Sequence, residues 1–350
     1  MLKMIFSVTC SHSFSLVLTL AVLFSLNASL AQIHHDENTE HFVIVKIGGS
    51  SITDKGQFET LNETSLTWFA QTIKESTLSN NRKIIIVHGA GSFGHYHAKQ
   101  FGLSSVSNPG KKEESTEMLP DFNERLKEGV SKTRLSVQTL HLKLISALIQ
   151  QNINAIGISP FSVSPVYDND LDLNLLSASV THAVNRGMVP VIHGDVVFES
   201  DIGAAILGGD DIVTGIASHF VQVASASKIN SCHENNAQVE VVFITDVDGV
   251  FTSDPKENKN AELVPLLEVS NHGGLMQMKG EEVIHASKSS HEHDVTGGLQ
   301  SKLKSAIEIA KQSVKVSIVK CGSINALQAI KGDKFDVGTT ITLRMKKEIQ

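Results

Sequence analysis

A lysine followed by two glycines and a serine is the first group of residues in this sequence that could do chemistry. Lys46 lies near the end of an apolar run, residues 42–47, and Gly48, Gly49 and Ser50 follow it. A fixed positive charge beside exposed backbone N–H groups suits an oxyanion or a phosphate. The segment matches neither the P-loop pattern nor the dinucleotide fingerprint. An ordinary strand-to-helix turn with a solvent-reaching lysine is an equal alternative from this segment alone.

A second glycine-rich turn favours the phosphate interpretation. Residues 84–87 are apolar, and the small residues of the stretch 88–94 lead directly to His95. Small residues let the backbone approach an anion closely, and an imidazole at the far end can donate to that anion. We therefore interpret His95 as a functional residue, with a purely structural histidine as the alternative.

A repeating pattern of strands and helices would position these turns. After residue 41, short apolar runs alternate with amphipathic stretches. The runs that predict buried strands are residues 42–47, 83–87, 189–193, 241–245 and 315–319. This rhythm predicts a mainly parallel sheet with helices on both faces. Ligands of such sheets bind beyond the carboxyl ends of the strands, so the turns should converge on one crevice.

Three polar stretches, residues 108–115, 168–172 and 270–294, predict loops. The last of them contains His285, His291 and His293. We interpret these histidines as solvated loop residues rather than as a metal site.

The composition excludes several functional classes. A chain of 350 residues with 41% hydrophobic and 19% charged residues has the composition of a globular protein. The formal charge of -7 and the absence of a long basic block argue against a nucleic-acid-binding surface. Cys10, Cys232 and Cys321 lie far apart in the sequence, which argues against a zinc site and a disulfide framework.

Four motifs occur in the order seen in amino acid kinases. They are Lys46-Ile47-Gly48-Gly49-Ser50, His88-Gly89-Ala90-Gly91-Ser92-Phe93-Gly94-His95, Thr245-Asp246-Val247-Asp248-Gly249-Val250-Phe251, and Asp294-Val295-Thr296-Gly297-Gly298-Leu299 with Lys302. The Gly-Ser-Phe-Gly-His ending resembles the isopentenyl phosphate kinase family specifically, because the acetylglutamate and aspartate kinase branches lack that histidine.

The resemblance covers roughly residues 42–343 and implies a particular fold. That fold is a three-layer αβα amino-acid-kinase-like arrangement with a central mainly parallel sheet. The implied kinase domain is residues 32–345, with a substrate lobe at about 42–215 and a nucleotide lobe at about 216–345. The resemblance also implies a homodimer.

The implied reaction is phosphoryl transfer from ATP, which needs charge neutralisation and alignment more than covalent help. Lys46 would stabilise the transferring phosphoryl group, Lys55 would reach in from the next segment, and Lys302 would hold the ATP phosphates. Asp210 would orient the lysines, because a phosphate monoester is already a nucleophile and needs no base. A helix N-cap is the alternative for Asp210, and the neighbouring Asp211 competes with it for the role.

The remaining implied site residues divide between the two substrates. The acceptor would contact Ala90, Gly91, His95, Gly157 and Gly194. ATP would contact Lys46, Gly48, Gly49, Ser50, Gly91, Asp246, Asp248, Gly249, Gly298 and Lys302. Turn glycines and strand-capping aspartates have plainer structural explanations, which stay open. Mg²⁺ is expected with ATP, held mainly by phosphate oxygens and water rather than by a carboxylate cage.

The leading functional hypothesis is conversion of isopentenyl phosphate and ATP to isopentenyl diphosphate and ADP, which feeds isoprenoid biosynthesis. The apolar tail would need a pocket, for which Phe93, Ile156, Ile158 and Phe161 are candidates, although each is also a plausible core residue. One alternative is a kinase for another phosphate or phosphonate, as in the fosfomycin kinases, which share a histidine in the equivalent loop. The other is a non-catalytic small-molecule binder of the same fold.

Residues 1–31 predict a targeting segment. Lys3 precedes an apolar run, residues 14–26, and Ser29 and Ala31 stand where a signal peptidase reads. The run is short for a membrane span, and the lack of arginine before Arg82 argues against a transit peptide. A secretory signal, a membrane anchor and the first part of an organelle signal all stay open. Membrane contact is expected only through this segment, and the kinase domain in an ATP-containing compartment such as the cytosol.

Overall fold

The apolar runs of the sequence become central strands because their residues are buried on both faces. The computed structural model of the protein describes residues 40–77, 82–105, 120–161, 163–164, 166–167, 170–199, 203–230, 238–253, 255, 258–270, 275–277 and 298–344. In β1 (His41–Ile47) every residue after the first is buried. Full burial of one such aliphatic side chain stabilises a fold by roughly 2 kcal/mol.

The described residues form short strands joined by helices. The other strands are β2 (Arg82–His88), β3 (Ala155–Ile158), β4 (Val166–Tyr167), β5 (Asp170–Leu171), β6 (Val189–His193), β7 (Asp195–Glu199), β8 (Gly203–Leu207), β9 (Gln238–Thr245), β10 (Leu266–Val269), β11 (Leu275–Gln277), β12 (Lys315–Lys320) and β13 (Thr339–Leu343). The helices are α2 (Gly49–Ile52), α3 (Glu63–Thr77), the 3₁₀ turn η1 (Gly91–Phe93), α4 (His95–Phe101), α5 (Pro120–Gln150), α6 (Asn174–Val184), α7 (Gly209–Asn230), α8 (Gly298–Ala310) and α9 (Ile324–Lys331).

Two sheets organise the described strands. The larger has nine strands in the order β11-β10-β13-β12-β9-β1-β2-β6-β3, and β12, β9, β1, β2, β6 and β3 are all parallel. The antiparallel pairs of this sheet are β12 with β13 and β10 with β11. A smaller sheet, β5-β4-β7-β8, branches off after β6. The carboxyl ends of β9, β1, β2 and β6 therefore lie side by side.

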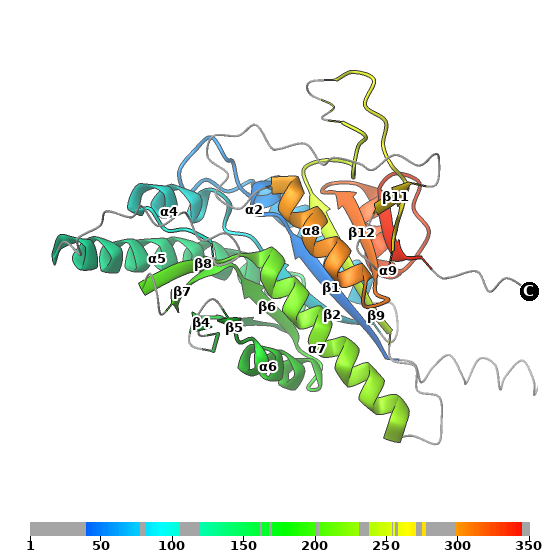
Figure 1. Ribbon diagram of the computed structural model, residues 1–350, viewed down its shortest axis with the longest axis horizontal. Helices are drawn as coiled ribbons and strands as arrows, with labels where there is room; N and C mark the ends of the chain where they lie inside the picture. Colours follow the sequence, from blue (N-terminus) through cyan, green and yellow to red (C-terminus); the bar gives the residue numbers. More distant parts are fainter. Residues whose placement is uncertain are drawn as a thin grey trace, which may run out of the picture.

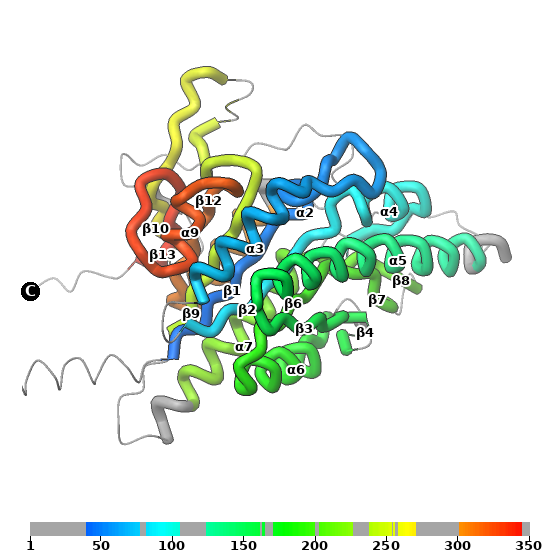
Figure 2. The backbone as a smooth tube through the Cα atoms, turned by 180° about the vertical axis from the view of Figure 1, so that it is seen from behind, coloured from blue at the N-terminus to red at the C-terminus, as the bar shows by residue number. Residues whose placement is uncertain are grey.

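Helices cover both faces of the large sheet, which confirms the expected three-layer αβα fold. Alternate residues of β1 face opposite ways: Ile44 packs in a core with α6, α7 and α8, and Val45 packs in a second core with α3, α5 and α9. Figure 1 shows α7 and α8 in front of the sheet, and Figure 2 shows α3 and α5 on the other side. The five strands expected from the apolar runs are all present.

Two of the predicted loops are wrong in part. The stretch 168–172 contains the short strand β5, and the stretch 270–294 contains β11. Both strands are only two or three residues long and pair with the strands just before them, β4 and β10, so the polarity of so short a stretch gave no sign of them. Residues 108–115, the targeting segment and the three loop histidines lie outside the described residues.

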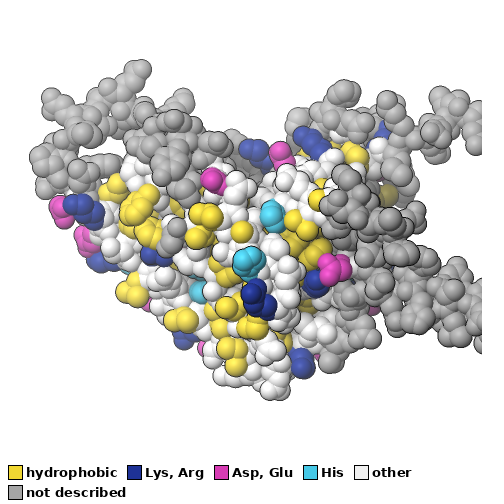
Figure 3. Space-filling view, turned by 90° about the horizontal axis from the view of Figure 1, so that it is seen from below, with side chains coloured by type: hydrophobic (Ala, Val, Ile, Leu, Met, Phe, Trp, Pro, Cys, Tyr) yellow, Lys and Arg dark blue, Asp and Glu magenta, His cyan; other side chains and the backbone are white. Residues whose placement is uncertain are grey.

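The division into two lobes near residue 215 stays a prediction, and α7 runs across that position. Within the described residues, no helix combines the length and apolar character needed to cross a bilayer. On the face drawn in Figure 3, basic and acidic side chains are interspersed with apolar and uncharged ones.

Candidate active site

The turns after β1, β2 and β6 meet at one edge of the sheet. In each turn a glycine N–H donates to a carbonyl of the neighbouring strand or turn at 3.0 Å, in the pairs Gly48 with Ile244, Gly89 with Ile47, and Gly194 with His88. These bonds continue the parallel ladder one residue past each strand. The glycine turns that the sequence indicated therefore lie side by side at one edge of the sheet.

The first two turns approach each other so closely that only glycine fits. A Cβ on Gly49 would lie 2.1 Å from the nitrogen of Gly91. Ala90 is in the αR conformation and Gly91 has a φ of +54°. Successive αR and left-handed residues turn their N–H groups toward one point and form an anion-binding concavity. Among the described residues, no acceptor contacts the N–H groups of Ala90 or Gly91.

A threonine hydroxyl locks the two turns together. Thr53 Oγ1 donates to the Gly49 carbonyl at 2.8 Å and accepts from the Ser92 N–H at 3.0 Å. Thr53 is 3% exposed, so both bonds are protected from water. The concavity is thus held in shape by side chains buried beneath it.

Lys46 and Asp210 form a buried ion pair under these turns. The Lys46 amine lies 2.7 Å from Asp210 Oδ1, and the two side chains are 6% and 9% exposed. Gly209, at the start of α7, lies beside this pair, and a Cβ there would be in ordinary contact with Lys46 Cε at 3.5 Å. Asp210 lies inside the first turn of α7 rather than at an N-cap position. The adjacent Asp211 carboxylate turns back toward Gly208.

A second lysine also acts on Asp210. Burial would raise the pKa of Asp210, but the charges of Lys46 and Lys302 and hydrogen bonds from Lys46 and Ser301 outweigh it and hold that pKa below its ordinary value. Lys302 and Ser301 belong to the first turn and a half of α8. The N-termini of α7 and α8, whose dipoles favour an anion, therefore converge with two lysines on one carboxylate.

His95 and Lys55 lie at the other side of the glycine turns. His95 is half-buried and begins α4 directly after the second turn. Lys55 is exposed, and its backbone carbonyl accepts a hydrogen bond of 3.3 Å from the Tyr96 hydroxyl. Phe58 packs edge-on against Tyr96 at 5.6 Å. The segment with Lys55 is therefore attached to the helix that carries His95.

The third motif forms the turn after β9, on the opposite side of Lys46 from His95. Asp246 is exposed, and Asp248 Oδ2 lies 3.6 Å from the Lys320 amine. Gly249 lies against Thr339, whose Oγ1 would be 2.6 Å from a Cβ at that position. Of the fourth motif, residues 294–297 lie outside the described residues, and Gly298 begins α8.

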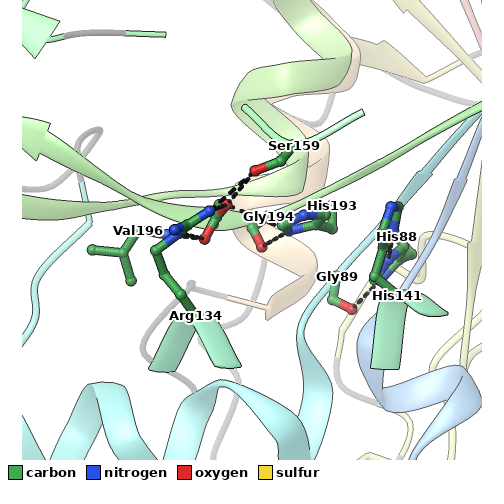
Figure 4. A network of polar contacts seen from close by, with 9 residues as sticks. His88, Gly89, Arg134, His141, Ser159, His193, Gly194 and Val196 are labelled. Atoms are coloured by element: carbon green, nitrogen blue, oxygen red, sulfur yellow. Dashed lines mark hydrogen bonds and ion pairs between the residues drawn. The ribbon is translucent and has the colours of Figure 1, made fainter. Parts of the chain in front are cut away.

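Two polar groups near the acceptor turns were missed by the sequence reasoning. One is a cluster of buried imidazoles, His88, His141 and His193. The other is an ion pair in which Nε of the half-buried Arg134 lies 3.1 Å from Oδ1 of the buried Asp195, supported by Ser159. Figure 4 shows both groups side by side. The sequence signals were His88 in the second motif and the His-Gly-Asp run that starts at the end of β6, whereas His141 and Arg134 come from the long helix α5.

The predicted tail-pocket residues do not lie together. Phe93 is in the core that contains α3 and α5, Ile158 packs on the opposite core, and Ile156 is 42% exposed on β3. Phe161 instead joins a small separate apolar cluster between α4, α5 and the four-stranded sheet. The buried members of that cluster are Ala98, Leu103, Val130, Val196 and Ala204. This cluster adjoins the helix that begins with His95.

Comparison with known proteins decides the family. A sequence model of the amino acid kinase family matches residues 41–221 and 236–320. This chain belongs to the amino acid kinase family. Among its relatives in that family, isopentenyl phosphate kinase from Arabidopsis thaliana is 29% identical over 334 residues, which cover 84% of this chain and 91% of the plant protein. Isopentenyl phosphate kinase from Thermoplasma acidophilum is 30% identical over 273 residues, covering 78% and 88% of the two chains.

Solved structures of amino acid kinases agree with this placement. An X-ray structure of isopentenyl phosphate kinase matches with a TM-score of 0.62 and 25% identity, covering 86% of this chain and 100% of that one. A product complex of the Thermoplasma acidophilum enzyme matches with a TM-score of 0.60 and 25% identity, covering 86% and 99%. The isopentenyl phosphate kinase branch expected from the Gly-Ser-Phe-Gly-His ending is thus the branch to which these similarities point.

Proposed function

We propose that this protein is an isopentenyl phosphate kinase, which transfers the γ-phosphoryl group of ATP to isopentenyl phosphate. The observation that carries the proposal is the buried Lys46–Asp210 pair, 2.7 Å apart, beneath two facing glycine turns. Phosphoryl transfer depends on positioned charge more than on covalent help. The similarity to isopentenyl phosphate kinases over most of both chains supports this acceptor over others.

The residues of the site divide the work by position. Lys46 lies between the glycine turns and the start of α7, where its charge would stabilise the phosphoryl group during transfer. Lys46 and Lys302 hold the pKa of Asp210 below its ordinary value, so Asp210 stays a carboxylate that orients the two lysines rather than taking a proton. His95 lies at the end of the second turn and would donate to the acceptor phosphate, with the N–H groups of Ala90 and Gly91 on its other oxygens.

The nucleotide would occupy the side of Lys46 that carries α8 and the turn after β9. Lys302 and the N-terminus of α8 suit the phosphates. Asp246, Asp248 and Gly249 would line the part of the site that holds the nucleoside. No group of three or more His, Cys, Asp or Glu residues in the described part of the chain is arranged to hold a metal ion. Mg²⁺ fits this site as a companion of the ATP phosphates, where it would neutralise their charge.

The apolar cluster beside α4 is the part of the described chain that we assign to the hydrocarbon tail of the acceptor. It comprises Ala98, Leu103, Val130, Val196 and Ala204, all at most 9% exposed, with partly buried Phe101 and Leu126 around them. A short branched tail attached to a phosphate at His95 would extend toward this cluster.

The homodimer implied by the family is also a proposal. Leu135, Leu142 and Ile149 recur every seven residues along α5, and their exposed fractions are 68%, 67% and 54%. An apolar stripe with this spacing is typical of a helix that packs on a second helix. Light scattering on the wild type and on Leu142→Glu would test it, with a dimer that becomes monomeric as the expected result.

The test of function is a coupled assay of ADP release with isopentenyl phosphate, dimethylallyl phosphate, fosfomycin and acetylglutamate as parallel acceptors. Preferential turnover of the isoprenoid monophosphates is expected. Turnover of fosfomycin or acetylglutamate alone would replace the acceptor but keep the kinase. Absence of ADP release with every acceptor would favour a binding protein of the same fold.

A further inference from the structure

Three imidazoles are buried together behind the acceptor turns. His88 ends β2, His193 ends β6, and the two residues are partners in the parallel ladder. His141 reaches them from α5, and the ring centroids of the cluster are 4.5 to 5.8 Å apart. The exposed fractions are 0% for His88 and His193 and 7% for His141 (Figure 4). Burial of a polar ring costs free energy unless its nitrogens are hydrogen-bonded. His88 and His141 are hydrogen-bonded to each other.

Two hydrogen bonds connect His141 to the acceptor turn. The nitrogen Nε2 of His88 lies 3.0 Å from Nδ1 of His141, and Nδ1 of His88 lies 3.0 Å from the carbonyl oxygen of Gly89. A carbonyl oxygen only accepts, so the proton of His88 is on Nδ1. Burial, followed by the nearby His193, lowers the pKa of His88 to about 3. A neutral His88 carries no proton on Nε2, which therefore accepts from the Nδ1–H of His141.

The Gly89 carbonyl belongs to the same peptide unit as the Ala90 N–H. In a planar trans peptide the C=O and N–H bonds point in opposite directions. Fixing the Gly89 oxygen on the imidazole side therefore directs the Ala90 N–H to the other side, into the anion-binding concavity. The preceding peptide is fixed as well, because the Gly89 N–H donates to Ile47 and the His88 carbonyl accepts from Gly194.

We propose that His141 is a positioning residue for the acceptor phosphate, which acts through His88 to orient the Gly89–Ala90 peptide. This inference rests on the proposed kinase function. It assigns to the long helix α5 an indirect influence on acceptor binding, through His88. His141 also borders Gly157, where a Cβ would lie 2.5 Å from its Nε2, so Gly157 is required for the imidazole to keep this place.

The first experiment compares His141→Leu, which removes the donor, with His141→Asn, whose amide can donate from nearly the position of Nδ1. Loss of a positioned hydrogen bond in His141→Leu is expected to raise the KM for isopentenyl phosphate about tenfold and to leave the KM for ATP within about twofold. His141→Asn should recover most of the acceptor KM. His219→Leu is the matched control, because His219 is a helical histidine with one hydrogen bond, to Thr181, and lies in α7 beyond the first turn that carries Asp210. It should keep both KM values.

The second experiment is independent of turnover. Long-range ¹H–¹⁵N spectra of the wild type should show His88, identified by its loss in His88→Gln, with its proton on Nδ1. In His141→Leu the His88 Nε2 resonance should shift as its donor disappears. A proton on Nε2 of His88, an unchanged acceptor KM in His141→Leu, or an equal rise in both KM values would overturn the proposal. Failure of the proposed function would appear separately, as wild-type protein that releases no ADP with isopentenyl phosphate.

Discussion

The Lys46 amine lies 2.7 Å from Oδ1 of Asp210, where the end of β1 meets the first turn of α7. The two residues are separated by most of the implied substrate lobe in the sequence, yet they form one buried unit. Replacing Lys46 tests the catalytic role of this pair, and replacing Asp210 tests its structural role.

Replacing Lys46 with methionine removes the charge but keeps most of the side-chain volume. Because the charge would stabilise the transition state, kcat should fall by about 10²-fold or more. The coupled ADP-release assay measures this, and far-UV circular dichroism should show an unchanged fold. Lys304→Met, an exposed lysine of α8, is the control and should keep wild-type kcat. A fully active Lys46→Met enzyme would exclude the assigned role.

Replacing Asp210 with alanine leaves Lys46 buried without its partner. Loss of one member of a buried pair should lower the free energy of unfolding by about 3 kcal/mol, measured by urea denaturation at neutral pH. The folded-state pKa of Asp210 is below its ordinary value, so its contribution is complete above the unfolded pKa and is lost as pH falls. The stability difference between wild type and variant should therefore shrink below about pH 4. A difference that grows on acidification would contradict the assigned charge state.

Gly49→Ala places a Cβ 2.1 Å from the Gly91 nitrogen, which is backbone and cannot move aside cheaply. The two turns must separate, so stability should fall by about 1–3 kcal/mol and the acceptor KM should rise strongly. Gly187→Ala is the control for backbone effects, since its φ is +72° and nothing lies within 4 Å of the added Cβ. It should cost about 1 kcal/mol without changing KM. Equal kinetic effects in both variants would mean that the close approach is unimportant.

Arg134→Leu would leave the Asp195 carboxylate, whose side chain is 0% exposed, without its charged partner. Ser159 and the Val196 N–H would still donate to it, but they carry no charge. The free energy of unfolding should fall by about 3 kcal/mol. Lys127→Ala, which breaks an exposed pair with Glu124, should cost under about 1 kcal/mol. Similar losses for both variants in thermal or urea unfolding would refute the distinction between the buried and the exposed pair.

Much of this protein could be predicted from local sequence. The apolar run that became β1 needs burial on both faces, and only the middle of a covered sheet provides it, so strand positions and fold class followed from hydrophobicity alone. Gly49 and Gly91 were identified because glycine permits backbone conformations and close approaches that other residues do not. Lys46, His95 and Lys302 were named from motifs whose spacing reflects a strand, a turn and a helix start.

The partners of those residues depended on contacts between distant segments. The first turn of α7 directs Asp210, and not Asp211, toward Lys46. The tail-pocket candidates lie in separate cores. His141 and Arg134 are unremarkable helical residues in the sequence. Only the packing of α5 across the ends of β2, β3 and β6 buries them against His88 and Asp195, where unpaired polar groups would be too costly. Local patterns thus determined the strands and the glycine turns, whereas tertiary packing decided which polar groups hold those turns in place.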